Sequence, residues 1–193
     1  MKIPRPEDIK EIFDAYYPAD IKFWVEFAKA IECRTFAKND IIKPYNKIEK
    51  FINILVSGSV AHFVPYDDKD ICINLYYENN LFSDYLSFIS QKPTVIKTLC
   101  LEDAELWSIS YQHLQMLYAK SDQSLRIGKA ISDIMFIKKQ SEQINLLTLS
   151  PTERYLKLVK ERPEIFQRTP LKVIASYLGM APESLSRIRK KIS

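Results

Sequence analysis

Hydrophobic residues near the start of the chain recur at helical spacing. Apolar and aromatic side chains stand three and four positions apart at Phe13, Tyr16, Tyr17, Phe23, Trp24, Phe27, Ala28 and Ile31. This is the period of one face of an α-helix. Pro18 lies between the two halves of the pattern, and proline interrupts a helix. We therefore expect two short helices here.

From about Ile31 to Ser110, hydrophobic residues occur instead in short runs separated by polar and turn-forming residues. The runs are Ile41–Ile42, Phe51–Val56, Val60–Val64, Ile71–Tyr77, Val95–Leu99 and Leu106–Ile109. Several short strands at regular spacing are typical of an antiparallel sandwich or barrel. The segment Pro65–Lys69, rich in Pro and Asp, is expected to form a hairpin turn.

Helical periodicity returns after Ser110, which is placed to cap a short helix. A longer helix is predicted from about Ser121 to Leu147, with a broad apolar arc that includes Ile127, Ile131, Ile134 and Ile137. Such an arc is wider than packing on one neighbour requires. We expect one face to cover the β domain and the other to meet a second subunit, as coiled-coil seams do. The alternative is a helix buried within one subunit.

A new helix begins at Ser150-Pro151-Thr152-Glu153. Serine is a good N-cap, proline suits the first helical position, and a glutamate three residues after the cap completes a capping box. The helix is expected over Pro151–Arg162 and to be closed by Pro163. We therefore place the boundary between the body and a C-terminal domain at Thr148–Ser150.

The strongest local motif is a helix-turn-helix over Leu171–Lys190. Thr169-Pro170 is expected to open it as cap and first helical residue, and Ala175 is small where the two helices approach. Gly179 suits a left-handed turn, while Leu185 begins the inward face of the second helix. A small residue, a glycine four later and an apolar residue six beyond match the helix-turn-helix unit.

The outward face of the second helix is polar and basic. We expect Glu183, Ser184 and Arg187 to read base edges in the major groove, since arginine pairs with guanine and glutamate with the cytosine amino group. Residues predicted to hold phosphates are Lys172, Arg189, Lys190 and Lys191. Residues 151–193 carry ten Lys/Arg against four Asp/Glu, which favours a polyanionic partner. The alternative is a two-helix hairpin with a solvated polar face.

Other functional classes find little support in the sequence. Cys33, Cys72 and Cys100 lie far apart and His62 and His113 belong to no motif, so neither a metal site nor a cofactor is predicted. No nucleophile elbow or phosphate-binding loop suggests an enzyme. No run is long and apolar enough for a membrane span, and the polar start is unlike a signal peptide. We expect a cytoplasmic location.

Taken together, these motifs make the chain resemble the Crp/Fnr family of bacterial transcription regulators over nearly its whole length. The run Ile174–Gly179 followed by Pro182–Lys190 is similar to the family's recognition region, and Ile52–Val60 to the strand pair of its cyclic-nucleotide-binding β-roll. The resemblance implies an α+β fold with an N-terminal double-stranded β-roll sensor domain of jelly-roll type, a long dimerisation helix and a C-terminal winged helix-turn-helix. The expected divisions are 1–120, 121–147 and 148–193.

One segment departs from the family pattern. Family members that bind cyclic nucleotides carry glycines and an arginine in a phosphate-binding cassette, but Glu78–Thr94 contains no Gly and no Arg. A cyclic phosphate needs close backbone N–H groups and a cation, whereas Asp84 adds negative charge. Lys92 or Lys97 is a candidate substitute for the arginine. Candidate effector-pocket residues are Tyr76, Phe82, Ser83, Asp84, Tyr85 and Lys92, and the alternative is that the aromatics simply fill the space.

The sequence therefore predicts a sequence-specific, non-enzymatic DNA-binding regulator with a degenerate or non-standard effector site. Expected partners are double-stranded DNA, a second copy of the chain, an unidentified small-molecule effector and RNA polymerase. Two alternatives stay open. One is a cyclic-nucleotide-gated regulator with an unusual cassette, and the other is a signalling module that acts by protein contact without binding DNA.

Overall fold

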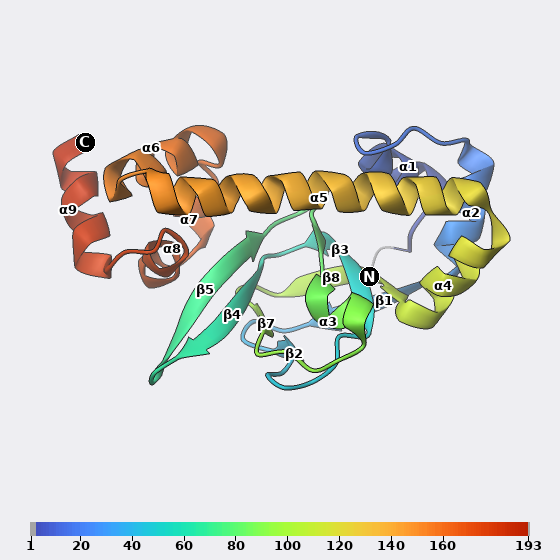
Figure 1. The fold of residues 1–193 in the computed structure, drawn as a ribbon, viewed down its shortest axis with the longest axis horizontal. Coiled ribbons are helices and arrows are strands. Elements are labelled where there is room, and N and C mark those ends of the chain that lie inside the picture. Colours follow the sequence, from blue (N-terminus) through green and yellow to red (C-terminus); the bar gives the residue numbers. More distant parts are fainter. Residues whose placement is uncertain (1–2, 193) are drawn as a thin grey trace.

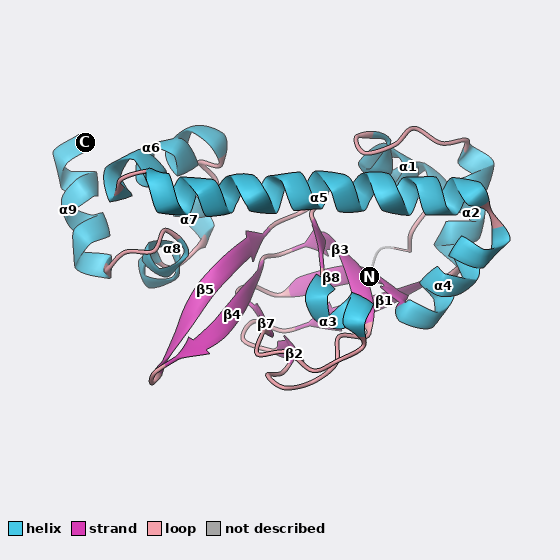
Figure 2. Ribbon diagram, viewed as in Figure 1, coloured by secondary structure: helices cyan, strands magenta, loops and turns pink. Residues whose placement is uncertain are grey.

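A β-roll lies beneath one long helix, and a small helical unit follows at the far end of that helix in the computed structural model, which describes residues 3–192 (Figures 1 and 2). The helices are α1 (Pro6–Asp14), α2 (Ile21–Lys29), α3 (Tyr85–Ser90), α4 (Tyr111–Lys120), α5 (Asp122–Thr148), α6 (Pro151–Glu161), α7 (Ile165–Arg168), α8 (Leu171–Tyr177) and α9 (Pro182–Ile192). The strands are β1 (Ile31–Phe36), β2 (Ile41–Lys43), β3 (Phe51–Ser57), β4 (Val60–Tyr66), β5 (Lys69–Tyr76), β6 (Leu81–Phe82), β7 (Lys97–Cys100) and β8 (Ala104–Ser110).

The two predicted N-terminal helices are confirmed as α1 and α2, with Pro18 in the loop between them. Asp20 caps α2 by accepting a hydrogen bond from the Lys22 backbone N–H. Trp24 is fully buried and stacks on Phe13 with ring centroids 4.9 Å apart. These aromatic contacts pack α1 and α2 together, in the same core cluster as Trp107 of the roll and Ile127 of α5.

The strands form two antiparallel sheets that face each other. Their strand orders are β1-β8-β3-β6 and β2-β7-β4-β5. The buried residues between them include Leu55, Val60, Phe82, Cys100 and Leu106. The six predicted runs all contain strand residues, but β1 and β6 were not predicted as runs, because β1 carries Glu32, Arg34 and Thr35 and β6 has only two residues.

Two turns in the roll depend on unusual backbone angles. The predicted hairpin between β4 and β5 is confirmed, with Tyr66 paired to Lys69 and Asp67 at φ +49°. Gly58 joins β3 to β4 at φ +93°, and a Cβ there would lie 2.1 Å from the Asp103 carbonyl oxygen. Only glycine fits this turn, since the left-handed angle and the close backbone both exclude a side chain.

The long helix α5 spans 27 residues, as predicted to within a residue at each end. Ser110 caps α4 and Ser121 caps α5, each by accepting backbone N–H bonds with its hydroxyl. Along α5, Ile127 is buried and Ile131 packs against the same core. Ile134 and Ile137 are 39% and 64% exposed. One face of α5 therefore packs on the core of its own chain, and another faces solvent.

The C-terminal unit confirms the predicted capping box, in which Ser150 and Glu153 bond each other's backbone N–H at the start of α6. Two details differ from the prediction. Pro170, not Thr169, is the N-cap of α8, because the Thr169 hydroxyl is hydrogen-bonded to the Tyr77 hydroxyl of the roll. Helix α9 runs to Ile192, so residues 3–192 contain no hairpin wing after it.

Among the described helices, none combines the length and the apolar character that a membrane crossing requires.

Candidate nucleic-acid interface and effector site

Helices α8 and α9 form the predicted helix-turn-helix around a small apolar centre. Ile174, Ala175 and Leu185 are at most 1% exposed, and Leu178 is also buried. Gly179 makes the turn at φ +65°. Its Cα faces the end of α5 so closely that a Cβ would lie 3.0 Å from Leu146 Cδ1. A side chain at position 179 would therefore meet both an unfavourable backbone angle and a tight contact.

The predicted base-reading residues lie together on the solvent side of α9. Glu183 and Arg187 are one helical turn apart and Ser184 lies beside them, and all three are exposed. The predicted phosphate-contacting residues Lys172, Arg189, Lys190 and Lys191 are exposed as well. The buried Leu185 on the opposite side holds this helix against α8, so the polar face points away from α8. Helix α9 itself lies at one end of the molecule (Figure 1).

The helix-turn-helix is fastened to the β-roll of its own chain by contacts that the sequence did not reveal. Arg168 donates to both carboxylate oxygens of Glu78 at 2.7 and 2.8 Å, to Glu102 at 2.6 Å and to the Gly58 carbonyl at 3.1 Å. Ser176 accepts a hydrogen bond from the Cys72 backbone N–H of β5 at 2.9 Å. These partners are 66 to 110 residues apart in the chain, so no local sequence motif predicts the contacts.

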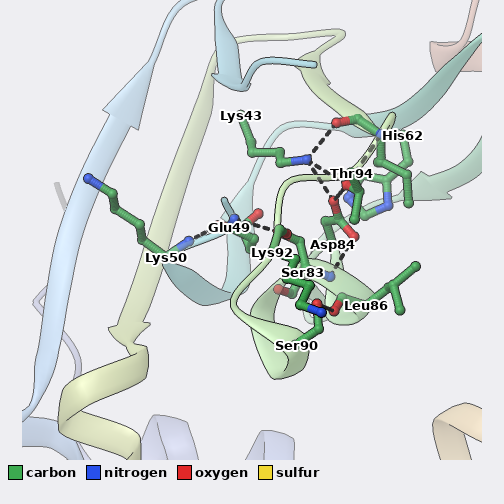
Figure 3. A network of polar contacts seen from close by, with 12 residues as sticks. Lys43, Glu49, Lys50, His62, Ser83, Asp84, Leu86, Ser90, Lys92 and Thr94 are labelled. Atoms are coloured by element: carbon green, nitrogen blue, oxygen red, sulfur yellow. Dashed lines mark hydrogen bonds and ion pairs between the residues drawn. The ribbon is translucent and has the colours of Figure 1, made fainter. Parts of the chain in front are cut away.

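In the roll, a buried ion pair organises the segment Glu78–Thr94 (Figure 3). Lys43 Nζ lies 2.7 Å from Asp84 Oδ2, and the two side chains are 3% and 0% exposed. Lys43 also donates to Thr94 Oγ1 and to the Ile96 carbonyl, both at 2.8 Å. The negative charge expected at Asp84 is therefore balanced by Lys43, a residue 41 positions away that belongs to no sequence motif.

The remaining candidate effector residues do not meet in one place. Tyr76 and Phe82 pack on each other inside the roll with centroids 5.3 Å apart, whereas Tyr85 is 46% exposed and hydrogen-bonded to Ser132 of α5. The Ser83 hydroxyl donates to the Phe51 carbonyl at 2.9 Å. Lys92 is exposed. The other lysine considered as a substitute for the arginine, Lys97, pairs with Asp70.

His62 completes the packed interior beside Tyr76. The two rings lie 4.9 Å apart, and the Tyr76 hydroxyl is 3.3 Å from His62 Nδ1. The Tyr76 hydroxyl also accepts a hydrogen bond from the Asn74 amide at 2.8 Å. Burial lowers the pKa of His62 to about 3, so the ring is neutral near pH 7. These contacts support the interpretation that aromatic side chains fill the roll.

Comparison with known proteins identifies the fold. No protein-family model and no curated protein matches the chain. The c-di-GMP responsive global regulator CLP of Xanthomonas campestris superposes with a TM-score of 0.70 at 21% identity, covering 90% of this chain and 91% of that one. FixK2 from Bradyrhizobium japonicum gives 0.71 at 14% identity and 84% of each chain. The catabolite activator protein of Thermus thermophilus gives 0.55 at 13% identity, over 97% and 83%.

The chain thus shares the fold of these three proteins along most of its length. The α+β architecture predicted from the resemblance to the Crp/Fnr family is confirmed, with a β-roll, a long helix and a C-terminal helix-turn-helix in that order.

Proposed function

We propose that this chain is a sequence-specific DNA-binding transcription regulator that works as a homodimer in the cytoplasm. The observation that carries the proposal is the exposed polar face of α9, with Glu183, Ser184 and Arg187 above the buried Leu185. The fold shared with the regulator CLP over 90% of the chain supports it. We propose three parts for this regulator: a β-roll sensor domain at 1–120, a dimerisation helix at 121–147 and a DNA-binding domain at 148–193.

In this proposal, α9 enters the major groove. Arg187 bonds a guanine edge, Glu183 accepts from a cytosine amino group and Ser184 contacts a neighbouring base. Lys172 on α8 and the basic residues Arg189, Lys190 and Lys191 at the end of α9 hold phosphates and supply affinity without sequence information. RNA polymerase would be the further partner of such a regulator.

The solvent face of α5 is the proposed dimer contact. Ile137 and Ile144 lie seven residues apart, hence on the same side of the helix, and are 64% and 57% exposed. Ile134 borders them, while Ile127 packs within its own subunit. A second copy of α5 would cover this apolar face, and two-fold symmetry would then place the two recognition helices about 34–36 Å apart on the duplex.

The effector site is proposed to be degenerate or non-standard. The residues present do not fit a cyclic phosphate, which needs a free cation to pair with. The segment Glu78–Thr94 has no arginine, and the buried Lys43 that contacts this segment is already paired with Asp84. Calorimetry with cAMP and cGMP tests this. We expect no heat of binding at millimolar ligand, and saturable heat would support the cyclic-nucleotide-gated alternative instead.

Selection of bound sites from random double-stranded DNA by the purified protein is the test of the proposed function. We expect enrichment of an imperfect palindrome whose half-sites lie one duplex turn apart. Binding that is sensitive to salt but blind to sequence would contradict the proposal and favour a module that acts by protein contact. Repeating the selection with a metabolite extract would reveal an effector as a change in enrichment.

A further inference from the structure

Arg154, in the first turn of α6, connects the long helix to the helix-turn-helix. Its guanidinium donates to the carbonyls of Leu146 at 3.2 Å and Leu149 at 2.7 Å, at the end of α5. It also donates to the carbonyls of Leu178 at 2.9 Å and Gly179 at 3.5 Å, where α8 ends and the turn begins. One side chain therefore contacts four backbone carbonyls from two different helix ends.

The chemistry of a helix end explains why an arginine occupies this place. The last four carbonyls of a helix have no partner within it and form the negative end of its dipole. Arginine is always charged and presents five N–H donors in a rigid fork, so it can satisfy several carbonyls from both helices at once. A lysine would supply the same charge on a single nitrogen atom, which could not reach all four carbonyl oxygens at once.

Two neighbouring features hold this connection in register. The Ser150–Glu153 capping box starts α6 directly after α5, which fixes where Arg154 stands. Gly179 leaves 3.0 Å between its Cβ position and Leu146 Cδ1, so the turn rests directly on the last turns of α5. The end of α5 and the turn before α9 are therefore in contact both through apolar atoms and through the Arg154 hydrogen bonds.

We propose that Arg154 is a positioning residue that fixes the recognition helix α9 relative to α5, and so sets the half-site spacing that the dimer accepts. This inference rests on the proposed function. Arg154 need not touch DNA to act in this way. Because α5 is the proposed two-fold contact, the angle between α5 and the helix-turn-helix determines how far apart the two α9 helices lie.

The experiment measures affinity for a series of palindromes whose central spacer is changed by one or two base pairs, and for a single half-site. The wild-type protein should prefer one spacing. The Arg154→Gln variant should lose about tenfold of this discrimination, the scale expected for charge-assisted hydrogen bonds, with its affinity for the half-site retained. Arg154→Lys keeps the charge but not the fork, and should show the same loss of spacing preference.

Lys157→Gln is the matched control, since Lys157 lies on the same helix and pairs with Glu161 at the surface. It should keep the spacing preference. An unchanged preference in both Arg154 variants would overturn the inference, and so would an equal loss on every spacing and on the half-site, which indicates only a damaged fold. If Arg154→Gln does not fold, Arg154→Lys decides alone. Failure of the wild-type protein to bind any sequence selectively would instead refute the proposed function.

Discussion

Arg187 and Lys190 lie on the same exposed stretch of α9, but we assign them different roles. Arg187→Ala should relax preference at one base pair of each half-site, at a cost of about 1–3 kcal/mol on the preferred base. Lys190→Ala should weaken binding to all sequences nearly equally and reduce the slope of log affinity against log salt by about one. Titrations on the selected site, on single-base variants and at several salt concentrations measure both effects. Indistinguishable variants would show that the division of roles is wrong.

The buried pair of Lys43 and Asp84 provides a test of stability inside the roll. Asp84→Asn leaves the Lys43 ammonium buried without its counter-charge, so the free energy of unfolding should fall by about 3–5 kcal/mol. Replacing both residues, as Lys43→Met with Asp84→Leu, removes both charges and should restore most of that loss. Urea denaturation measures the two variants. A double variant that is as unstable as the single one would contradict this account.

His62 makes the stability of the roll depend on pH. Its pKa is about 3 in the folded protein and about 6.5 when unfolded, so between these values only the unfolded chain binds the proton. The free energy of unfolding therefore falls as pH is lowered through this window, by up to about 1.4 kcal/mol per pH unit from this residue. His62→Phe should show a shallower loss between pH 6.5 and 4.5 in urea denaturation. Parallel curves for the two proteins would refute the assignment.

At this scale, the sequence predicts a residue's position in the fold well when the motif is local. Glu183, Arg187 and Gly179 belong to one short pattern, and the structure places all three where that pattern expects them. Lys43 and Asp84 are 41 residues apart, and nothing in the sequence next to either predicts their contact. Arg154 lies in the sequence as an ordinary helix residue, and its role depends on the turn 24 and 25 residues later.

Helix α6 shows how much one helix start depends on its cap. The Ser150 hydroxyl accepts the Glu153 N–H, and the Glu153 carboxylate accepts the Ser150 N–H at 2.8 Å. Ser150→Ala should lower the free energy of unfolding by about 1 kcal/mol. Ser141→Ala is the control, because Ser141 is exposed within α5 and only back-bonds to the Ile137 carbonyl. Thermal and urea unfolding of both variants measure the difference, and equal stabilities would contradict the prediction.

Elements were predictable where periodicity and end signals agree. Ser110, Ser121 and Ser150 each cap the helix expected after them. The predictions failed where a tertiary contact competes with a local preference. Thr169 would suit an N-cap, but its hydroxyl bonds Tyr77 of the roll instead, and β1 is a strand because it pairs along its whole length with β8.

At the scale of the whole molecule, the sequence suggested separate domains, whereas the structure joins them through one apolar cluster. Phe63 and Leu75 of the β4–β5 hairpin pack in the same cluster as Ile165 and Ile174 of the helical unit. The Arg168 contacts with Glu78 and Glu102 lie beside it. The charge of the chain changes after Thr148–Ser150, where the sequence analysis placed the domain boundary. Which surfaces pack together depends on their three-dimensional shape, and the pattern of residues along the chain does not reveal that shape.

The proposed dimer leads to a prediction at the scale of the whole molecule. Ile137 lies near the middle of the exposed apolar face of α5 and is 64% exposed. Ile137→Glu would place two carboxylates close to the two-fold axis in an apolar contact, where burial of unpaired charge is costly. Sedimentation should then show a monomer, and affinity for the palindrome should fall by about a hundredfold or more, because two linked half-sites no longer act together.

Gln143→Glu is the matched control for this change. It adds the same charge to an exposed position of α5, but six residues from Ile137, on a different side of the helix from both Ile137 and Ile144. It should remain a dimer with unchanged affinity. Half-site binding should be the same in both variants, since neither change touches α9. Either of two results would exclude α5 as the dimer contact: a wild-type protein that sediments as a monomer at micromolar concentration, or an Ile137→Glu variant that stays dimeric. Without a dimer contact on α5, its angle to the helix-turn-helix could not set a preferred spacing between half-sites.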